Sequence, residues 1–308
     1  RTRLFFGDIV RGTPQYARLV DNANDDYFDL SAVVLDKNGF VLHTMLDRLY
    51  MEYNSGPLEI SLGRQRINWG INTLWNPNDI FNAFNFTDFD YEERPGSDAL
   101  RVRYYTGFAS SIEIAAKAFD HWDEAVAAAL WKFNRNQYDL QLLAGIAQGD
   151  AALGLGWAGN LKNAGFKGEA TWFVPWQKNR PQSFTATFGI DYSFSNALFV
   201  NTGYLYNSNG STGEGNIFGF TLSARNLYPY RNAVFASAGY PFNPLLQGSI
   251  AAIYSPVRSH ALFLNPALAY SLSENWTLDL VGQIAFSRSD KRYTVPIQAV
   301  FFRVKWSY

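Results

Sequence analysis

Apolar and polar residues alternate with a period of two along most of the chain. In "NWTLDLVGQIAF", Trp276, Leu278 and Leu280 share one face, whereas Thr277 and Asp279 take the other. The stretches "SFTATFGIDYS" and "FKGEATWFV" alternate in the same way. Successive side chains of a β-strand point to opposite faces, so this pattern predicts strands rather than helices. The segments are roughly 9–12 residues long, which is the length of a tilted strand that crosses a bilayer.

The connections between these segments fall into two classes. Short turns are predicted at "YNSGPL", "YTGFA", "FNRNQY", "NLKNAG", "SFSNA" and "SENW". Longer polar links are predicted at 66–97, 119–123, 147–150, 175–181, 207–229 and 287–295. Short turns on one side and longer loops on the other are typical of an outer-membrane barrel. We therefore expect an all-β fold, a single transmembrane antiparallel β-barrel domain over 1–308, with about 16 strands and 18 as the alternative.

The parity of the side chains also predicts how the first barrel hairpin pairs. A turn over Asn54–Pro57 sets Tyr53 opposite Leu58, and Glu52 then lies opposite Glu59. The two carboxylates share the inner face, while the apolar residues share the outer face.

The next hairpin gives the same sorting. A three-residue turn over Thr106–Phe108 pairs Tyr105 with Ala109 and sets Arg101 opposite Glu113 on the inner face. A slip of one residue would move every side chain to the other face, so the agreement between the hairpins supports the assignment of faces.

The last segment, "AVFFRVKWSY", alternates to the end of the chain. Phe302, Val304 and Trp306 are expected to face lipid, and Arg303 and Lys305 to face the lumen. In a closed barrel this strand pairs with the first one and leaves no free edge. The first residue is Arg1 and no leader pattern is visible, so we interpret the chain as mature or truncated.

Composition excludes several classes of protein. The net charge is -1 and charged residues make up only 17% of the chain, which does not suggest a nucleic-acid partner. A typical soluble domain has about a quarter charged residues. There is no cysteine, which excludes disulfides and thiolate metal sites. The sequence contains no run of about 18 apolar residues, so it predicts no transmembrane helix.

The polar faces and the link 66–97 supply the candidate site. We expect this link to fold into the lumen and form a charged constriction, or else to cap or brace the barrel. The predicted pore-lining or constriction residues are Arg48, Glu52, Glu59, Arg64, Arg66, Arg94, Arg101, Arg103, Glu113, Lys117, Asp191, Asp279, Arg303 and Lys305.

Aromatic residues gather near the ends of the predicted strands. The residues expected to form a membrane girdle are Tyr53, Tyr104, Trp172, Tyr192, Tyr270, Trp276, Trp306 and Tyr308. A sugar-binding track along the lumen is the alternative, but most of these residues share the parity of the lipid face.

Enzyme and metal chemistry have little support. The three histidines are His43, His121 and His260, and the "SH" at 259–260 cannot form a dyad because neighbours on a strand point apart. The acidic stretch "DNANDDYFD" at 21–29 lacks the spacing of an EF-hand. We expect no enzymatic activity, no cofactor and no bound metal.

The series "GRQRINWG…LWNPNDIFN…RPGSDALRVRY", together with the aromatic final strand, resembles a group of Gram-negative outer-membrane β-barrels of the porin-like and alginate-export-like type. The matching residues cover about 40 positions and the last ten. The resemblance implies a location in the outer membrane of a Gram-negative bacterium, and passage or export across it. The terminal aromatic also resembles the signal that outer-membrane assembly machinery reads.

Three hypotheses follow for the function. The first is a channel for small polar solutes or for export of a polymer. The second is a structural or partner-binding barrel subunit of a secretion or assembly complex, and the third is a barrel hydrolase. The expected partners are the lipid bilayer, the assembly machinery and other envelope proteins.

Overall fold

The computed structural model describes residues 2–6, 8–13, 15–21, 27–83, 96–213, 220, 222–258, 260–289 and 292–306. These residues form two short helices, α1(Asp8–Gly12) and α2(Tyr16–Asp21), and the strands β1–β18. Neither of these helices is long and apolar enough to cross a membrane. Every strand pairing is antiparallel, which confirms the all-β prediction.

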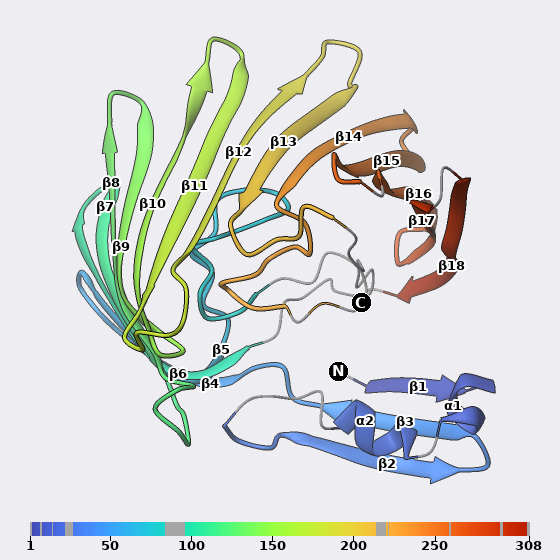
Figure 1. Ribbon diagram of the computed structural model, residues 1–308, viewed down its shortest axis with the longest axis horizontal. Coiled ribbons are helices and arrows are strands. Elements are labelled where there is room, and N and C mark those ends of the chain that lie inside the picture. The colour runs from blue at the N-terminus through green and yellow to red at the C-terminus, as the bar shows by residue number, and fades with distance from the viewer. Residues whose placement is uncertain are drawn as a thin grey trace.

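Fifteen strands form one sheet in which each strand pairs with its neighbours in the sequence. The sheet bends into a wide arc that brings β18 round toward β4 (Figure 1). Its strands are β4(Leu49–Ser55), β5(Leu58–Gln65), β6(Ser97–Gly107), β7(Ser110–Lys117), β8(Val126–Arg135), β9(Tyr138–Ala147), β10(Asp150–Leu161), β11(Ala164–Pro175), β12(Ser183–Ser193), β13(Phe199–Asn207), β14(Asn232–Asn243), β15(Leu246–Ser255), β16(Ala261–Ser273), β17(Trp276–Ser289) and β18(Arg292–Trp306).

The other three strands, β1(Thr2–Phe6), β2(Ser31–Lys37) and β3(Phe40–Met45), form a small sheet in the order β1-β3-β2. It lies with α1 and α2 beside the two ends of the arc (Figure 1). Alternation in the sequence predicts barrel strands at 2–10, 27–36 and 41–53, the last of them continuous. The structure ends β3 at Met45 and begins β4 at Leu49.

The large sheet has an exposed apolar outer face. On β8 and β9, Trp131 and Leu142 are each 47% exposed, whereas the adjacent Leu130 and Leu143 are buried on the inner face. Large exposed apolar side chains repeat in this way around the arc, which is the arrangement of a sheet whose outer solvent is lipid. The predicted outer residues Leu280 on β17 and Phe302 on β18 are 44% and 67% exposed, so the predicted outer face is confirmed for these two strands.

The predicted registers of the first two barrel hairpins are wrong by two residues. In the first, Glu52 lies opposite Ser61, not Glu59. A two-residue turn at Gly56 and Pro57, with Gly56 at φ 55°, replaces the expected four-residue loop.

In the second hairpin, Arg103 rather than Arg101 lies opposite Glu113, and a register shift between Tyr105 and Gly107 tightens the turn. A slip of two residues keeps every side chain on its face, so alternation alone could not detect either error.

Short turns connect the strands at one end of the arc, as predicted. At the other end, two predicted links are wrong. Residues 147–150 contain only a tight turn at Gln148 and Gly149, both with positive φ. Most of 287–295 belongs to β17 and β18, which pair as far as Ser289 and Arg292.

The final strand does not pair with the first one among the described residues. β18 pairs with β17, and β4 pairs with β5. Fifteen strands that alternate in direction leave both edge strands pointing the same way, so β4 and β18 cannot form an antiparallel pair.

The corrected register can be tested with cysteines, because the chain has none of its own. Directly opposite Cα atoms in an antiparallel pair are about 4.5–5.5 Å apart, within disulfide reach, whereas diagonal partners are about 7–8 Å apart. The double variant Glu52→Cys/Ser61→Cys should therefore oxidise faster than Glu52→Cys/Glu59→Cys. Free thiols can be counted by mass after alkylation, and the opposite order would restore the sequence-based register.

Candidate pore lining and constriction

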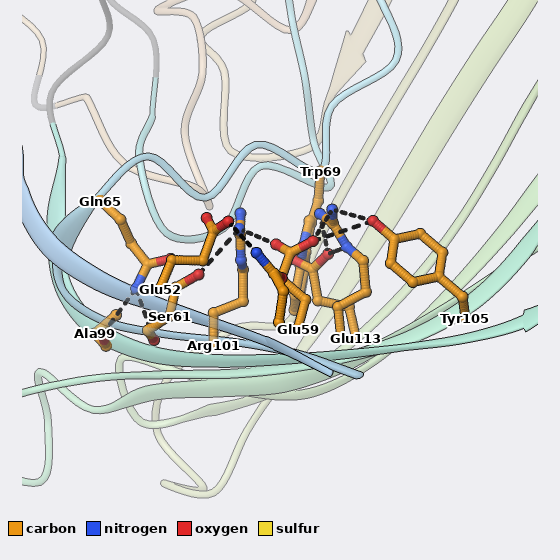
Figure 2. Close-up of polar contacts among 11 residues, drawn as sticks. Glu52, Glu59, Ser61, Gln65, Trp69, Ala99, Arg101, Tyr105 and Glu113 are labelled. Atoms are coloured by element: carbon orange, nitrogen blue, oxygen red, sulfur yellow. Dashed lines mark hydrogen bonds and ion pairs between the residues drawn. The ribbon is translucent and has the colours of Figure 1, made fainter. Parts of the chain in front are cut away.

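Four charged side chains form a network on the inner face of β5–β7. Arg101 lies 2.6 Å from Glu59, and Arg103 lies 2.5 Å from Glu113. A second nitrogen of Arg103 is 3.6 Å from the other oxygen of Glu59, so positive and negative groups alternate. Figure 2 shows Glu59, Arg101 and Glu113 rising from the same face of the sheet.

The network continues through two aromatic side chains. The Tyr105 hydroxyl donates to Glu59 at 3.1 Å and accepts from Arg103 at 3.3 Å. The Trp69 indole N–H donates to Glu113 at 2.6 Å. Trp69 lies on the chain that follows β5, so the charged wall is bonded directly to that segment (Figure 2).

Residues 66–83, hereafter the inward segment, leave β5 and run through the interior of the arc (Figure 1). Ile67, Trp69, Ile80 and Phe81 are buried against the inner face of the sheet, mainly against small side chains such as Ala128. The prediction that the link folds into the lumen is confirmed for this part, and residues 84–95 lie outside the described residues.

Polar contacts hold the inward segment against the wall. The Gln141 side-chain amide donates to the Trp69 carbonyl at 2.8 Å. The carboxylate of Glu169 on β11 accepts three backbone N–H groups of the segment, those of Ile71, Asn72 and Asn78, at 2.9–3.0 Å. Glu169 was not among the predicted site residues, although its place as an acidic residue on the inner face of β11 was a usable signal.

A second segment, residues 222–231, also packs into the arc before β14. Arg225 forms an ion pair with Asp150 at 2.8 Å and donates to the Pro181 carbonyl at 2.7 Å. Tyr228 is fully buried, and this burial raises the pKa of its phenol. The sequence at 217–228 is compatible with a loop, a short helix or part of a strand, and the residues described there form a loop.

Arg64, a predicted constriction residue, is buried in an ion pair with Asp98 at 2.7 Å. Its guanidinium also donates to the carbonyls of Phe28 and Leu46, and the Phe28 N–H donates to Asp98 at 2.8 Å. Arg64 itself lies on β5, before the link, and braces the structure there. The ion pair joins β5 and β6 to the residues that precede β2 and follow β3.

The remaining predicted charges lie at separate places. Asp191 pairs with Lys167 at 3.1 Å, and Asp279 pairs with Arg303 at 2.6 Å. The exposed Glu52 accepts from Asn54 at 2.7 Å. Elsewhere, Arg48 is exposed between β3 and β4, Arg66 starts the inward segment, Lys117 ends β7, Lys305 is exposed on β18, and Arg94 lies outside the described residues.

Most of the predicted girdle residues are exposed on the outer face. Exposure is 42–61% for Tyr53, Tyr104, Trp172, Tyr270, Trp276 and Trp306. Tyr192 is half-buried, and Tyr308 lies outside the described residues. The rings of Trp276 and Trp306 lie 6.3 Å apart near the short-turn end. The girdle role itself stays a prediction.

Open space bordered by some charged and polar side chains remains near the short-turn end of the inner face. A pocket of about 480 Å³ is lined by Ile71, Tyr105, Ser111, Lys132 and Gln141, among others. Another of about 410 Å³ is lined by Gln247, Ser249, Asp279 and Arg303, among others. The two segments thus fill the half of the arc near the longer connections and leave these two pockets near the short turns.

The bracing role of Arg64 and Asp98 can be tested by replacing the acid. Removing one partner of a buried ion pair leaves the other charge uncompensated and costs about 3–5 kcal/mol. Asp98→Asn should therefore lower the temperature at which the folded band disappears on a heat-modifiable gel. The exposed control Glu52→Gln should change stability by less than about 1 kcal/mol. Equal transition temperatures for both variants would contradict the bracing role.

Comparison with known proteins supports the fold. No protein-family model and no curated protein matches the sequence. The chain is similar in structure to Acinetobacter baumannii OccAB4, with 9% identity, a TM-score of 0.56 and coverage of 83% of this chain and 73% of that one. It is also similar to Pseudomonas aeruginosa OccK10 (OpdN), with 8% identity, a TM-score of 0.56 and coverage of 83% and 82%. Both are Gram-negative outer-membrane porins, so the porin-like part of the resemblance is supported at the level of the fold, and the alginate-export-like part is not.

Proposed function

We propose that the protein is a channel of the Gram-negative outer membrane through which small polar solutes pass. The observation that carries this proposal is the charged network of Glu59, Arg101, Arg103 and Glu113 on the inner face of a sheet whose outer face is apolar. A sheet with lipid outside and charges inside encloses a polar path. The likeness of the fold to two outer-membrane porins supports the same conclusion.

The network predicts weak ion selectivity. Two carboxylates and two guanidinium groups face the same space at short distances, so their fields largely cancel for a passing ion. Lys132 lines the adjoining pocket. Removing the network's charges of one sign should therefore shift the selectivity toward permeating ions of that same sign.

A partner-binding barrel subunit is the second candidate. It is favoured by the two segments that pack inside the arc, because a filled lumen suits a scaffold as well as a narrow channel. Conductance separates the two readings. The assembly machinery and other envelope proteins stay predicted partners, and the single-domain organisation stays a prediction.

Polymer export and hydrolysis have less support. Nothing in the comparisons bears on a polymer. His43 contacts Asp21 at 3.2 Å, but the Ser31 hydroxyl donates to the same Asp21 oxygen at 2.9 Å. In a nucleophilic triad the serine bonds to the histidine and the carboxylate orients that histidine from its other side. The order of the groups here is different.

The channel proposal predicts stepwise conductance of the purified protein in planar bilayers. Arg101→Gln/Arg103→Gln should shift the reversal potential toward cation preference, and Glu59→Gln/Glu113→Gln should shift it toward anion preference, because each removes one sign of charge from the path. The exposed turn variant Lys162→Gln is the control and should match the wild type. A correctly assembled barrel that never conducts would refute the proposal and favour the partner-binding reading.

A further inference from the structure

Glu169 binds both ends of the tip of the inward segment. One carboxylate oxygen accepts the N–H groups of Ile71 and Asn72 at 3.0 and 2.9 Å, and the other accepts that of Asn78 at 3.0 Å. The carboxylate is fully buried. A single side chain therefore closes the loop of residues 72–78 and fixes it on β11.

The surroundings of Asn78 reinforce this attachment. Its side chain donates to the Leu155 carbonyl at 3.0 Å and accepts from Thr171 at 2.7 Å. A Cβ at Gly154 would overlap the Asn78 side-chain oxygen, so the close approach depends on glycine at that position. The loop of residues 72–78 is consequently attached to the inner face of the sheet at one site, hereafter the seat, which has Glu169 at its centre.

The tip of this loop carries Trp75, which reaches the second segment. Its ring lies 5.4 Å from the ring of Tyr228 and 6.4 Å from that of Phe235, both in edge-on geometry. Tyr228 is itself fixed, because its carbonyl accepts from Asn207 at 2.7 Å and its hydroxyl accepts from Ser255 at 3.1 Å. The two segments therefore share one aromatic contact.

We propose that Glu169 is the positioning residue of the channel. Its carboxylate seats the inward segment in the lumen, and through Trp75 it also supports residues 222–231, so one buried side chain sets the width of the conducting path. The inference deepens the proposed channel function and rests on it. Glu169 does not touch the permeating solute in this scheme.

Graded replacements test the seat. Glu169→Ala removes all three acceptors, whereas Glu169→Gln has one oxygen and one NH₂ group and keeps the bonds to Ile71 and Asn72 at best. Both variants should give larger and noisier conductance steps than the wild type, and Glu169→Ala should give the larger change. Thr185→Val is the matched control. Thr185 lies opposite Thr171 on β12 and is fully buried, and its hydroxyl makes no hydrogen bond within the described chain.

A disulfide can replace the seat. Thr73 accepts a hydrogen bond from the Asn201 side chain at 2.8 Å, which makes Thr73→Cys/Asn201→Cys a direct link between the loop and β13. In the Glu169→Ala background, oxidation of this pair should restore the wild-type step size, and reduction should abolish it. A purely structural role of Glu169 in assembly would not be rescued by a bond formed after folding.

The outcomes separate this inference from the channel proposal. Unchanged steps in correctly assembled Glu169→Ala barrels, or no rescue by a fully formed disulfide, would overturn the positioning role. If the wild type does not conduct at all, the channel proposal fails. The rate of disulfide formation in the Thr73→Cys/Asn201→Cys pair then still reports on Glu169. Replacing Glu169 should slow disulfide formation, and an unchanged rate would refute the positioning role.

Discussion

The structure depends on the pairing of one buried carboxylate with the backbone of the inward segment. A carboxylate removed from water is costly unless hydrogen bonds replace its hydration, and backbone N–H groups buried inside a barrel have the same requirement. Glu169 and the loop of residues 72–78 satisfy each other, with three charge-assisted bonds. Such bonds contribute about 1.5–3 kcal/mol each. The path of the inward segment, the place of Trp75 and the support of residues 222–231 all follow from this contact.

The lumen is consequently asymmetric. Near the longer connections, apolar residues of both segments pack against small inner-face side chains, as in an ordinary protein core. Near the short turns, the inner face keeps charged and polar groups around the pockets beside Lys132 and Asp279. Alanine and glycine on the inner face therefore mark where a segment approaches closely, whereas the charged groups that border the pockets lie where neither segment packs. This division is why a barrel with a partly filled interior can still provide a polar path.

The sequence predicted the parts of the site that local rules govern. Alternation placed Glu59, Arg101, Arg103 and Glu113 on one face, and the length of the link after β5 predicted a segment inside the barrel. It did not predict which arginine meets which carboxylate, because a register error of two residues keeps the same faces. The sequence also predicted Arg64 and Arg103 alike as constriction residues. Arg64 is buried in an ion pair with Asp98, whereas Arg103 borders the lumen.

The amino-acid sequence by itself determined that the chain forms β-strands and which side of each strand faces lipid or the lumen, because both depend on a period of two. It also determined that a segment enters the barrel, because this depends on the length of the link. The tertiary structure decided the registers, the separate sheet of β1–β3, the edges left at β4 and β18, and the role of Glu169. Each of these depends on contacts between residues far apart in the chain. Glu169 is about a hundred positions from the N–H groups it binds, and no local pattern encodes a partner at that distance.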